Sequence, residues 1–470
     1  MKTIITLLLF VLCSGLSIAK TWKVGTSRTY KLPSQVATLV SQGDTVEIDA
    51  GVYSSDVAKW TANNLVIKGV GGLAHLKSNG NASGGKGIWV IAGHGVKIEY
   101  IEFSECAVPD HNGAGIRIEG KNISISYCYF HHNENGILAG TVNPSTIIIE
   151  YTEFGFNGYG DGLTHNLYIN HVDTLIFRYN YSHHAMVGHE LKSRANVNYI
   201  LYNRLSDETN GTASRNIDLP NGGTSYIIGN IIEQGPQTQN SNLIGYGLEG
   251  FTNTSANEVY AINNTIINNR NGGSFFSFQA GTVLFKAFNN IIAGQGNFIT
   301  GTVPSNLDTA NNSIITTLSS FGFANSSNYD YHLTSSSKTC INNGKYPGTA
   351  SSFKLNPTSE YLHSNKTMAR CVSGILDIGA YEYCTLSQKE TPFIFYRLYP
   401  NPSNGKLTIE TPSSLNNTLE IYSVLGTLIG QYKLTKPQTE IQLNLEEGMY
   451  YYQINNQDKM VIKGKIILKY

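Results

Sequence analysis

Three segments of the chain, each about one repeat further along, carry side chains of the types that perform acid–base and metal chemistry. Each segment contains one apolar residue that we expect to point inward: Leu167, Leu191 and Ile217. With these three aligned, the neighbouring residues fall into four columns: His165, His189 and Arg215; Asn166, Glu190 and Asn216; Tyr168, Lys192 and Asp218; and Asn170, Arg194 and Pro220. If the segments are adjacent strands about 4.8 Å apart, about six or seven polar groups, the second and third columns among them, converge on one outward patch.

Such a patch suits β-elimination of a uronic-acid polysaccharide, which is a carbon–oxygen lyase reaction. The reaction needs a cation to neutralise the carboxylate beside the acidic C5–H, a base to remove that proton and an acid to assist the leaving oxygen. Calcium or an arginine can serve as the cation, and a lysine, histidine or tyrosine as the base. Neighbouring Arg194, or Ca²⁺ held by Glu190 and Asp218, would favour a neutral Lys192, whereas bare carboxylates would favour its charged form.

The elements that must position this patch form an internal repeat. A pattern of apolar-x-apolar-x-Tyr/Asn-x-x-apolar begins at Ile98, Ile125, Ile149, Phe177, Ile200, Ile228, Ile262 and Phe288, at intervals of 23 to 34 residues. The same position of the first five repeats is occupied by Tyr100, Tyr127, Tyr151, Tyr179 and Tyr202. Short alternating strands broken by Gly and Asn, with no room for a crossover helix, predict an all-β parallel β-helix solenoid over residues 20–385.

The ends of the solenoid are expected to be covered. Residues 34–41 predict a short amphipathic helix over the first coil, and coiling begins near Thr45. Residues 329–333 and 377–382 are expected to close the last coils. Covering matters because open rungs would otherwise pair edge to edge with other chains.

The repeat resembles the right-handed parallel β-helix proteins of the pectate-lyase superfamily. Within it, "GHELKSRANVNYILYNRL" (188–205) is similar to a segment of alginate-lyase-type β-helix lyases, in which a Lys-Ser pair follows an acidic residue and precedes an Asn-rich strand. In that family a lysine is the base, an arginine one coil later is the acid, and calcium held by acidic and amide residues neutralises the substrate carboxylate. By position the resemblance implies Lys192 as the base and Glu190 as a calcium ligand. It leaves Arg215, about one coil later, and Arg194 as alternatives for the arginine.

We therefore predict a secreted lyase that cleaves an acidic glycan. Lys192 would be the base, Arg215 or Arg194 the acid or the carboxylate clamp, and Glu190 with Asp218 the ligands of Ca²⁺. The predicted substrate subsites are lined by His165, Asn166, Tyr168, His189 and Asn216. The protein is expected to be a monomer.

Two other functions stay open. Glu190 and Asp218, with backbones expected about 8 Å apart, could be the carboxylate pair of an inverting glycoside hydrolase. The Asp-Asp motif of β-helix hydrolases that act on polygalacturonate is absent, and a Lys and an Arg between the carboxylates oppose the raised pKa of a general acid. Alternatively, the solenoid is a glycan-binding or adhesin-like surface protein, in which these charges form ordinary surface ion pairs worth about 0–1 kcal/mol each.

Both ends of the chain are predicted to carry targeting signals. Residues 1–19 have the pattern of a secretory signal peptide, with Lys2, an apolar stretch and a small-x-small site that ends at Ala19. The apolar stretch is shorter than the roughly 20 residues that span a bilayer, and no later stretch is long enough. Removal of the signal leaves an odd number of cysteines, of which a pair among Cys340, Cys371 and Cys384 could form a disulfide.

Beyond a polar linker at 386–397, residues 398–470 change character. "LYPNPSNG" supplies an extended entry and a hairpin signal, and short alternating strands follow, so we predict a small β-sandwich. This opening, together with Val424-Leu425-Gly426 and "EGMYYYQI", resembles the type A C-terminal sorting domain of the type IX secretion system of Bacteroidetes. The resemblance implies that the secretion machinery is a partner, and that the protein crosses the outer membrane and is displayed or released. An ordinary carbohydrate-binding or adhesive sandwich is the alternative.

Composition excludes further classes. The chain has 33 basic and 33 acidic residues and only 14% charged positions, which argues against a nucleic-acid binder. Hydrophobic residues make up 41% of the chain, enough for a core, which argues against bulk disorder. Low charge combined with 47 glycines and many β-branched and aromatic residues is typical of an all-β extracellular protein.

Overall fold

The computed structural model describes residues 19–372, 374–384, 397–399, 403–411, 417–424, 426–436, 438–456 and 459–469. These residues belong to two compact units, residues 1–384 and 385–470. Apart from Ala19 and Arg397, the predicted signal peptide and linker lie outside the described residues. No helix in the described part of the chain is long and apolar enough to cross a membrane.

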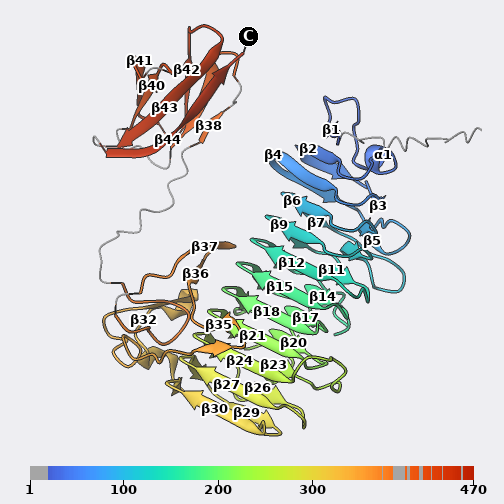
Figure 1. Ribbon diagram of the computed structural model, residues 1–470, viewed down its shortest axis with the longest axis vertical. Coiled ribbons are helices and arrows are strands. Elements are labelled where there is room, and N and C mark those ends of the chain that lie inside the picture. The colour runs from blue at the N-terminus through green and yellow to red at the C-terminus, as the bar shows by residue number, and fades with distance from the viewer. Residues whose placement is uncertain are drawn as a thin grey trace, which may run out of the picture. The chain divides into compact units, whose positions relative to one another are not determined.

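The first unit is a parallel β-solenoid with three faces (Figure 1). The groove face is a sheet of ten strands: β3 (Ala58–Trp60), β5 (Gly87–Ile91), β8 (Ala114–Ile118), β11 (Asn135–Ala139), β14 (Leu167–Ile169), β17 (Leu191–Ser193), β20 (Ile217–Leu219), β23 (Asn242–Tyr246), β26 (Ser274–Phe278) and β29 (Asn297–Gly301). Each strand pairs in parallel with the strand one turn earlier and one turn later. The predicted all-β solenoid is therefore confirmed.

The other two faces belong to one bent sheet. The second face comprises β1 (Thr21–Val24), β2 (Thr45–Ser54), β4 (Val66–Lys77), β6 (Lys97–Glu99), β9 (Ser124–Ser126), β12 (Thr146–Glu150), β15 (Thr174–Arg178), β18 (Val197–Leu201), β21 (Thr224–Ile228), β24 (Glu258–Ile262), β27 (Leu284–Phe288) and β30 (Asn306–Ala310). The third face comprises the second halves of β2 and β4 with β7 (Ile101–Ser104), β10 (Tyr129–His131), β13 (Glu153–Gly155), β16 (Tyr181–His183), β19 (Arg204–Ser206), β22 (Ile231–Gln234), β25 (Thr265–Asn268), β28 (Ile291–Gly294) and β31 (Ser313–Ile315).

The repeated sequence pattern marks a corner between these two faces. Each predicted strand, such as 98–103, is two strands that meet at the tyrosine position. The five tyrosines have φ between 50° and 62°, the left-handed conformation that turns the chain sharply. Their rings stack in one column, with centroids 4.9 to 5.7 Å apart. The column predicted from the spacing is thus confirmed, although the strand boundaries were wrong.

An asparagine ladder and an aromatic stack hold successive corners together from inside. Buried Asn203 and Asn230 each accept hydrogen bonds on Oδ1 from the backbone N–H and the side-chain amide of the asparagine one rung earlier, and Oδ1 of Asn180 accepts from the Thr152 N–H. On earlier rungs, the buried rings of Phe103, Phe130 and Phe154 stack with centroids 4.9 and 5.1 Å apart. Complete burial of such a side chain contributes about 1.5–3 kcal/mol, so the rungs are fixed in register from within.

The N-terminal end is covered as predicted, by a shorter helix. α1 (Ser34–Ala37) buries Val36 and Ala37 against the first rungs. The first rung starts with β1, which pairs with β2, so coiling begins earlier than Thr45.

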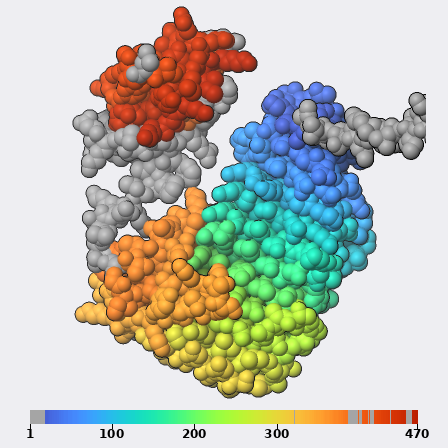
Figure 2. Space-filling view, viewed as in Figure 1, coloured from blue at the N-terminus to red at the C-terminus, as the bar shows by residue number. Residues whose placement is uncertain are grey.

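The expectation that residues 329–333 and 377–382 close the last coils is wrong. These residues belong to a flank segment, residues 318–384, that runs back along the second and third faces (Figure 2, orange). Ile231, Ile267 and Ile291 point outward from the strands of the third face. The flank segment covers them with its buried Tyr331, Tyr361 and Ile378 side chains. The segment contains η1 (Leu318–Ser320), β32 (Phe323–Asn325), η2 (Ser326–Asn328), β33 (Asp330–Leu333), β34 (Thr349–Ala350), β35 (Phe353–Lys354), β36 (Ser359–Leu362) and β37 (Lys366–Ala369).

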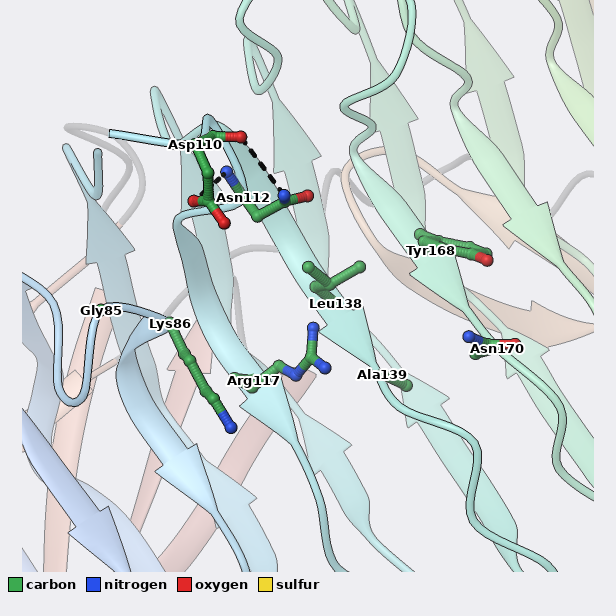
Figure 3. A pocket seen from close by; sticks show the side chains of 9 residues that line it. All are labelled: Gly85, Lys86, Asp110, Asn112, Arg117, Leu138, Ala139, Tyr168 and Asn170. Atoms are coloured by element: carbon green, nitrogen blue, oxygen red, sulfur yellow. Dashed lines mark hydrogen bonds between the residues drawn. The ribbon is translucent and has the colours of Figure 1, made fainter. Parts of the chain in front are cut away.

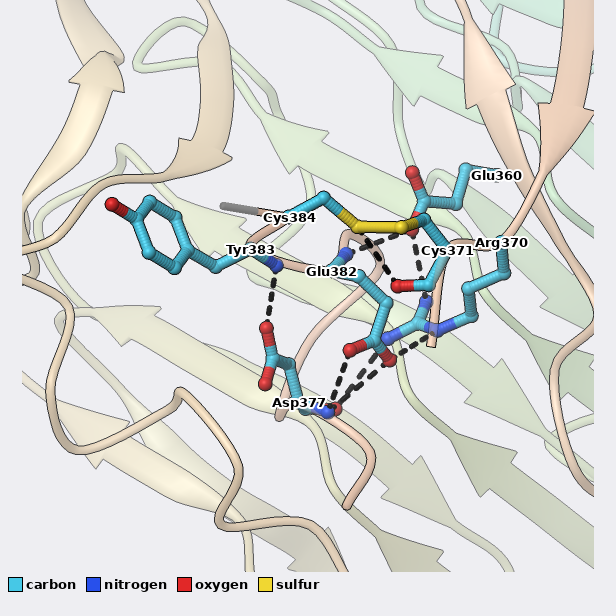
Figure 4. Close-up of a disulfide and its surroundings, with 7 residues drawn as sticks. All are labelled: Glu360, Arg370, Cys371, Asp377, Glu382, Tyr383 and Cys384. Atoms are coloured by element: carbon cyan, nitrogen blue, oxygen red, sulfur yellow. Dashed lines mark hydrogen bonds and ion pairs between the residues drawn. A yellow bond between two sulfur atoms is a disulfide. The ribbon is translucent and has the colours of Figure 1, made fainter. Parts of the chain in front are cut away.

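A disulfide fastens the end of the flank segment (Figure 4). It joins Cys371 to Cys384, one of the pairings that the sequence left open, and Cys340 is a buried free thiol. Beside it, the fully buried Arg370 side chain donates to Glu382 at 2.7 Å and to the carbonyl of Ala380 at 2.7 Å. Removal of one partner of such a buried ion pair typically costs about 3–5 kcal/mol, so this network anchors the segment.

The second unit is a small antiparallel sandwich, as predicted. One sheet contains β38 (Arg397–Tyr399), β39 (Lys406–Glu410) and β42 (Gln438–Gln442), and the other contains β40 (Asn417–Tyr422), β41 (Leu428–Leu434), β43 (Gly448–Asn456) and β44 (Lys459–Leu468). Side chains from both sheets form its core: Leu407, Ile409, Leu419, Ile421, Leu434, Leu443, Ile454, Ile466 and Leu468.

Candidate functional site

The groove face brings the predicted column together. Tyr168 on β14 pairs with Lys192 on β17, which pairs with Asp218 on β20. The residues beside them, Leu191 and Ile217, are completely buried, so the alternation along these strands turns the column outward. The predicted column of Tyr168, Lys192 and Asp218 is confirmed.

Lys192 lies between two carboxylates. Its Nζ is 2.8 Å from Oε1 of Glu249 and 3.4 Å from Oδ2 of Asp218. Asp218 is almost entirely buried, with a 2% exposed side chain, whereas the Glu249 side chain is 45% exposed. Burial raises the pKa of Asp218 despite the nearby Arg215 and Lys192, while hydrogen bonds from Lys192 and Arg194 outweigh the effect of burial and lower the pKa of Glu249. Lys192 therefore has one fixed and one accessible partner.

A loop brings Glu249 to this position from two turns away. Residues 247–257 follow β23 and cross back over the groove face. There Oδ1 of Asn196 accepts hydrogen bonds from the backbone N–H groups of Thr254, at 2.9 Å, and Ser255, at 2.7 Å. Asn253 donates to the carbonyl of Ala195 at 3.0 Å. Because β23 ends at Tyr246, Glu249 lies in the loop and reaches Lys192 only because the loop is fixed at both ends.

Two arginines lie on either side of Lys192 along the strand direction. Arg194 donates from Nε to the Tyr168 hydroxyl at 2.8 Å and from Nη2 to Glu249 at 2.5 Å, and its Nη1 donates to Asn221. Arg215, before β20, donates from Nη1 to Asp218 at 3.1 Å. Arg194 is thus held at three points and Arg215 at one.

A glycine makes room for Arg215. Gly245 follows Asp218 in the outward column, and a Cβ there would lie 3.0 Å from Nε of Arg215. A larger residue would therefore push this guanidinium out of the site.

Two histidines lie beneath the groove. The rings of His165 and His189 stack at 4.7 Å, as their predicted column requires, but both residues are buried. Burial lowers the pKa of each well below its ordinary value, so both rings are neutral. His189 Nε2 is 3.5 Å from Oδ2 of Asp218, and His165 packs edge-on against Tyr168 at 5.8 Å. They support the outward column from behind.

The prediction that Asn166, Glu190 and Asn216 face outward is wrong. All three are buried, with exposed fractions of 0%, 0% and 2%. They occupy the corner just before β14, β17 and β20, where the backbone turns and the alternation of a strand does not yet apply. Their side chains continue the interior polar ladder.

Glu190 is fully engaged inside that ladder. Its Oε2 accepts from Asn166 at 2.6 Å and from the Ser182 hydroxyl at 2.8 Å, and its Oε1 accepts from the Ala185 N–H at 3.0 Å. Burial, reinforced by the nearby Asp207, raises the pKa of Glu190 to about 8. Its roles as calcium ligand or hydrolytic acid stay predictions, and this placement supports neither.

The carboxylates beside Lys192 are engaged by basic side chains, so calcium held by Asp218 stays a prediction that this arrangement does not support. Calcium takes six to eight oxygen ligands. All four carboxylate oxygens of Asp218 and Glu249 face Lys192, Arg194, Arg215 or His189. Three basic side chains, Lys192, Arg194 and Arg215, surround two carboxylates, so the site itself can take up an anion.

The groove continues past Tyr168 into a cavity of about 350 Å³ (Figure 3). Its walls are formed by Gly85, Lys86, Asp110, Asn112, Arg117, Leu138, Ala139, Tyr168 and Asn170. Arg117 belongs to the same outward column as Lys192, three rungs earlier, and among the described residues no carboxylate lies within ion-pairing distance of it. Lys86, in contrast, pairs with Glu119.

Sequence reasoning missed Arg117, Glu249 and Asn221. Arg117 could have been found by extending the outward column to the rung two before Tyr168, since residues 115–120 show the same apolar alternation. Glu249 and Asn221 carry no such signal, because their positions depend on loops.

Comparisons with known proteins identify the second unit. Residues 397–469 match the family described as "Secretion system C-terminal sorting domain". The match confirms the sorting domain predicted for 398–470, and it indicates type IX secretion to the cell surface or the extracellular space. No curated protein sequence matches the chain.

Solved structures similar to the chain include three enzymes of pectin or alginate. Pectate lyase Pel9A aligns with a TM-score of 0.47 and 12% identity, over 78% of this chain and 97% of its own. Pectin methylesterase PemA from Erwinia chrysanthemi aligns with a TM-score of 0.30 and 10% identity, over 62% and 92%. A mutant of the PL6 family alginate lyase AlyGC aligns with a TM-score of 0.29 and 11% identity, over 79% and 58%. Likeness at this level does not assign an activity.

Proposed function

We propose that the first unit is a polysaccharide lyase that cleaves an acidic, uronate-containing glycan by β-elimination. The observation that carries the proposal is the position of Lys192 in the outward column of the groove face, beside Tyr168 and between Arg194 and Arg215. One amine flanked by two guanidiniums matches the base, the carboxylate clamp and the acid that the reaction needs.

One of the two arginines, Arg194 or Arg215, would bind and neutralise the uronate carboxylate, which makes the adjacent C5–H more acidic. Lys192 would accept that proton, the C5–H electrons would form the C4–C5 double bond, and the C4–O bond would break. The second arginine, or water that it orients, would protonate the leaving oxygen. The products are an unsaturated uronate and a new reducing end, and no step passes through a metal.

Lys192 can act as a base only after its ion pairs are loosened. Glu249 is the accessible partner, on a loop, and it also occupies Arg194. A substrate carboxylate that replaces Glu249 on Arg194 would release both side chains together. Substrate binding would thereby leave Lys192 paired with Asp218 alone, and Lys192 would act as the base once it has lost one proton to solvent.

The groove also supports an anionic polymer as the substrate. Arg117 and Lys86 lie on the earlier rungs that line the cavity beside Tyr168. A chain lying across the rungs would meet Lys86 and Arg117 on two adjacent rungs and Lys192 three rungs after Arg117, while Tyr168 could stack on a pyranose ring.

An activity screen of the purified full chain tests this proposal. Alginate, polygalacturonate, hyaluronan, chondroitin and ulvan would be incubated with and without calcium, and the ultraviolet absorbance of the unsaturated uronate followed. We expect a rise on one substrate that persists with chelator. New reducing ends without a rise in absorbance would indicate hydrolysis. No signal in either assay would favour a glycan-binding or adhesin-like protein.

The targeting signals at the two ends of the chain support a further part of the proposal, which concerns the location of the protein. We propose that residues 1–19 direct export across the inner membrane of a Bacteroidetes-type cell, and that the type IX machinery recognises residues 398–470 and removes them. The product would be a monomeric enzyme at or beyond the outer surface. Mass spectrometry of the secreted protein should find an N-terminus at residue 20 and no peptides from the sorting domain.

A further inference from the structure

The third face carries a cluster of two imidazoles and one carboxylate that lies outside the groove. His75 on β4 pairs directly with Glu102 on β7, and His131 lies on the next rung, on β10. Oε1 of Glu102 is 3.6 Å from Nδ1 of His75 and 3.0 Å from Nε2 of His131. One ligand atom from each residue lies within 4.8 Å of the others.

Each imidazole is held through its other nitrogen. Nε2 of His75 is 2.7 Å from the Ser104 hydroxyl, and Nδ1 of His131 is 2.8 Å from Nδ1 of His132. Both outer partners can accept as well as donate a hydrogen bond. When they accept, Nδ1 of His75 and Nε2 of His131 present lone pairs toward the Glu102 carboxylate. Such outer hydrogen bonds orient metal-binding histidines and fix their tautomers.

We propose that His75, Glu102 and His131 bind a divalent transition-metal ion such as Zn²⁺. Two imidazole nitrogens and a carboxylate oxygen are ligands of zinc, whereas calcium takes oxygen ligands only. The three side chains are 19%, 22% and 16% exposed, so a fourth position is open to water.

The metal would join three successive rungs of the solenoid. The residues come from β4, β7 and β10, which precede the rungs on which the flank segment packs. Within the described residues, the hydrogen bond of that segment earliest along the solenoid is from Asn365 to the carbonyl of Tyr151. An ion bound here stabilises the folded state by mass action, since the unfolded chain does not assemble the three ligands. The site would thus fasten rungs that the flank segment does not reach.

The test measures metal binding and thermal unfolding of the full chain. Metal-free protein would be titrated with Zn²⁺, Co²⁺ and Ca²⁺, with calorimetry, the visible spectrum of bound Co²⁺ and circular-dichroism melting as readouts. The variants are His131→Gln and Glu102→Gln, and the matched control is His94→Gln, which changes an exposed histidine. We expect one equivalent of Zn²⁺, a tetrahedral Co²⁺ spectrum and a raised Tm in the wild type and the control.

In the ligand variants zinc affinity should fall by at least about tenfold, because even the loss of an outer partner costs 10–100-fold. Equal circular-dichroism spectra of metal-free wild type and variants would show that the fold is kept. No zinc binding by the wild type, or undiminished binding by both folded variants, would overturn the proposal. So would a loss of binding in His184→Gln alone, because it would place the ion on the His183–His184 pair.

Discussion

Two columns of side chains, two residues apart in the sequence, lie on opposite sides of the groove-face backbone. Tyr168, Lys192 and Asp218 line the groove, while Asn166 and Glu190 are buried in the polar ladder behind it. Both columns contain a carboxylate with a raised pKa, and burial is the main cause in each. Asp218, however, is in contact with Lys192 and Arg215, whereas Glu190 accepts only from neutral donors. A raised pKa therefore does not by itself identify a catalytic carboxylate. The direction of the side chain and the charge of its partners distinguish a carboxylate in a candidate reactive site from one that only stabilises the fold.

The largest expected effect is the loss of activity when Lys192 of the outward column is substituted. Lys192→Ala should lower turnover by at least about 10²–10⁴, the usual contribution of a positioned base. The free energy of unfolding should change by no more than about 1–2 kcal/mol, because Arg215 remains paired with Asp218. Uronate absorbance and urea unfolding measure the two quantities.

Lys192→Arg sharpens the same test, since it keeps the positive charge but not the basicity. It should be as inactive as Lys192→Ala, while Lys286→Ala, which removes an outward lysine paired with Asp308 on the second face, should be fully active. Full activity of Lys192→Arg would remove the base assignment.

Substitution of Glu190 in the buried column should change how the free energy of unfolding depends on pH. The pKa of Glu190 is raised from 4.5 to about 8, so its contribution to stability is complete below pH 4.5 and is lost as the pH rises through about 8. Glu190→Gln cannot ionise, so its stability relative to the wild type should increase by a few kcal/mol, in order of magnitude, between pH 5 and pH 9.

Urea unfolding at both pH values measures this difference. Glu105→Gln, which changes a 43% exposed carboxylate, is the control and should track the wild type. A Glu190→Gln variant that is folded, equally sensitive to pH and inactive would reverse the comparison, because it would place Glu190 in the chemistry.

A smaller effect is expected from Glu249→Gln. The substitution removes the accessible charge that competes with substrate for Lys192 and Arg194. An ion pair of this exposure contributes up to about 1 kcal/mol, so KM for the acidic glycan should fall by up to about fivefold. Initial rates at several substrate concentrations decide the matter, and a raised KM would mean that Glu249 binds substrate directly.

The smallest effect on KM is expected for substitution of Arg117, three rungs before Lys192. Arg117→Ala should raise KM about two- to fivefold for long chains, through the loss of one exposed charge contact, and should leave kcat unchanged. Short oligosaccharides that do not reach the cavity should show no difference. Equal effects on long and short substrates would exclude the cavity as a subsite.

Much of this arrangement follows from the sequence. The repeat predicted the solenoid, and alignment on Leu167, Leu191 and Ile217 predicted the register that unites Tyr168, Lys192 and Asp218. Period-two reasoning failed for Glu190 because that residue lies at a corner, where two consecutive side chains can both point inward.

Contacts that depend on loops could not be predicted. Glu249 reaches Lys192 through a loop bound to Asn196, 58 residues before Thr254, and no local pattern encodes that distance. The path of the flank segment was missed for the same reason, since its partners lie in rungs formed much earlier in the chain.

The flank segment also changes how the solenoid can come apart. In an ordinary repeat protein each rung contacts only its neighbours, so the ends fray and unfolding can proceed one rung at a time. Here Asn365 is bonded to the carbonyl of Tyr151, the Thr358 N–H to the Tyr202 hydroxyl, and the Ala380 N–H to Thr265. A single continuous strap spans these rungs, and the disulfide and Arg370 close its end. The opening of any one of them must loosen contacts to the others, so the segment couples the central rungs into one cooperative unit and holds the groove rigid from the opposite side of the backbone.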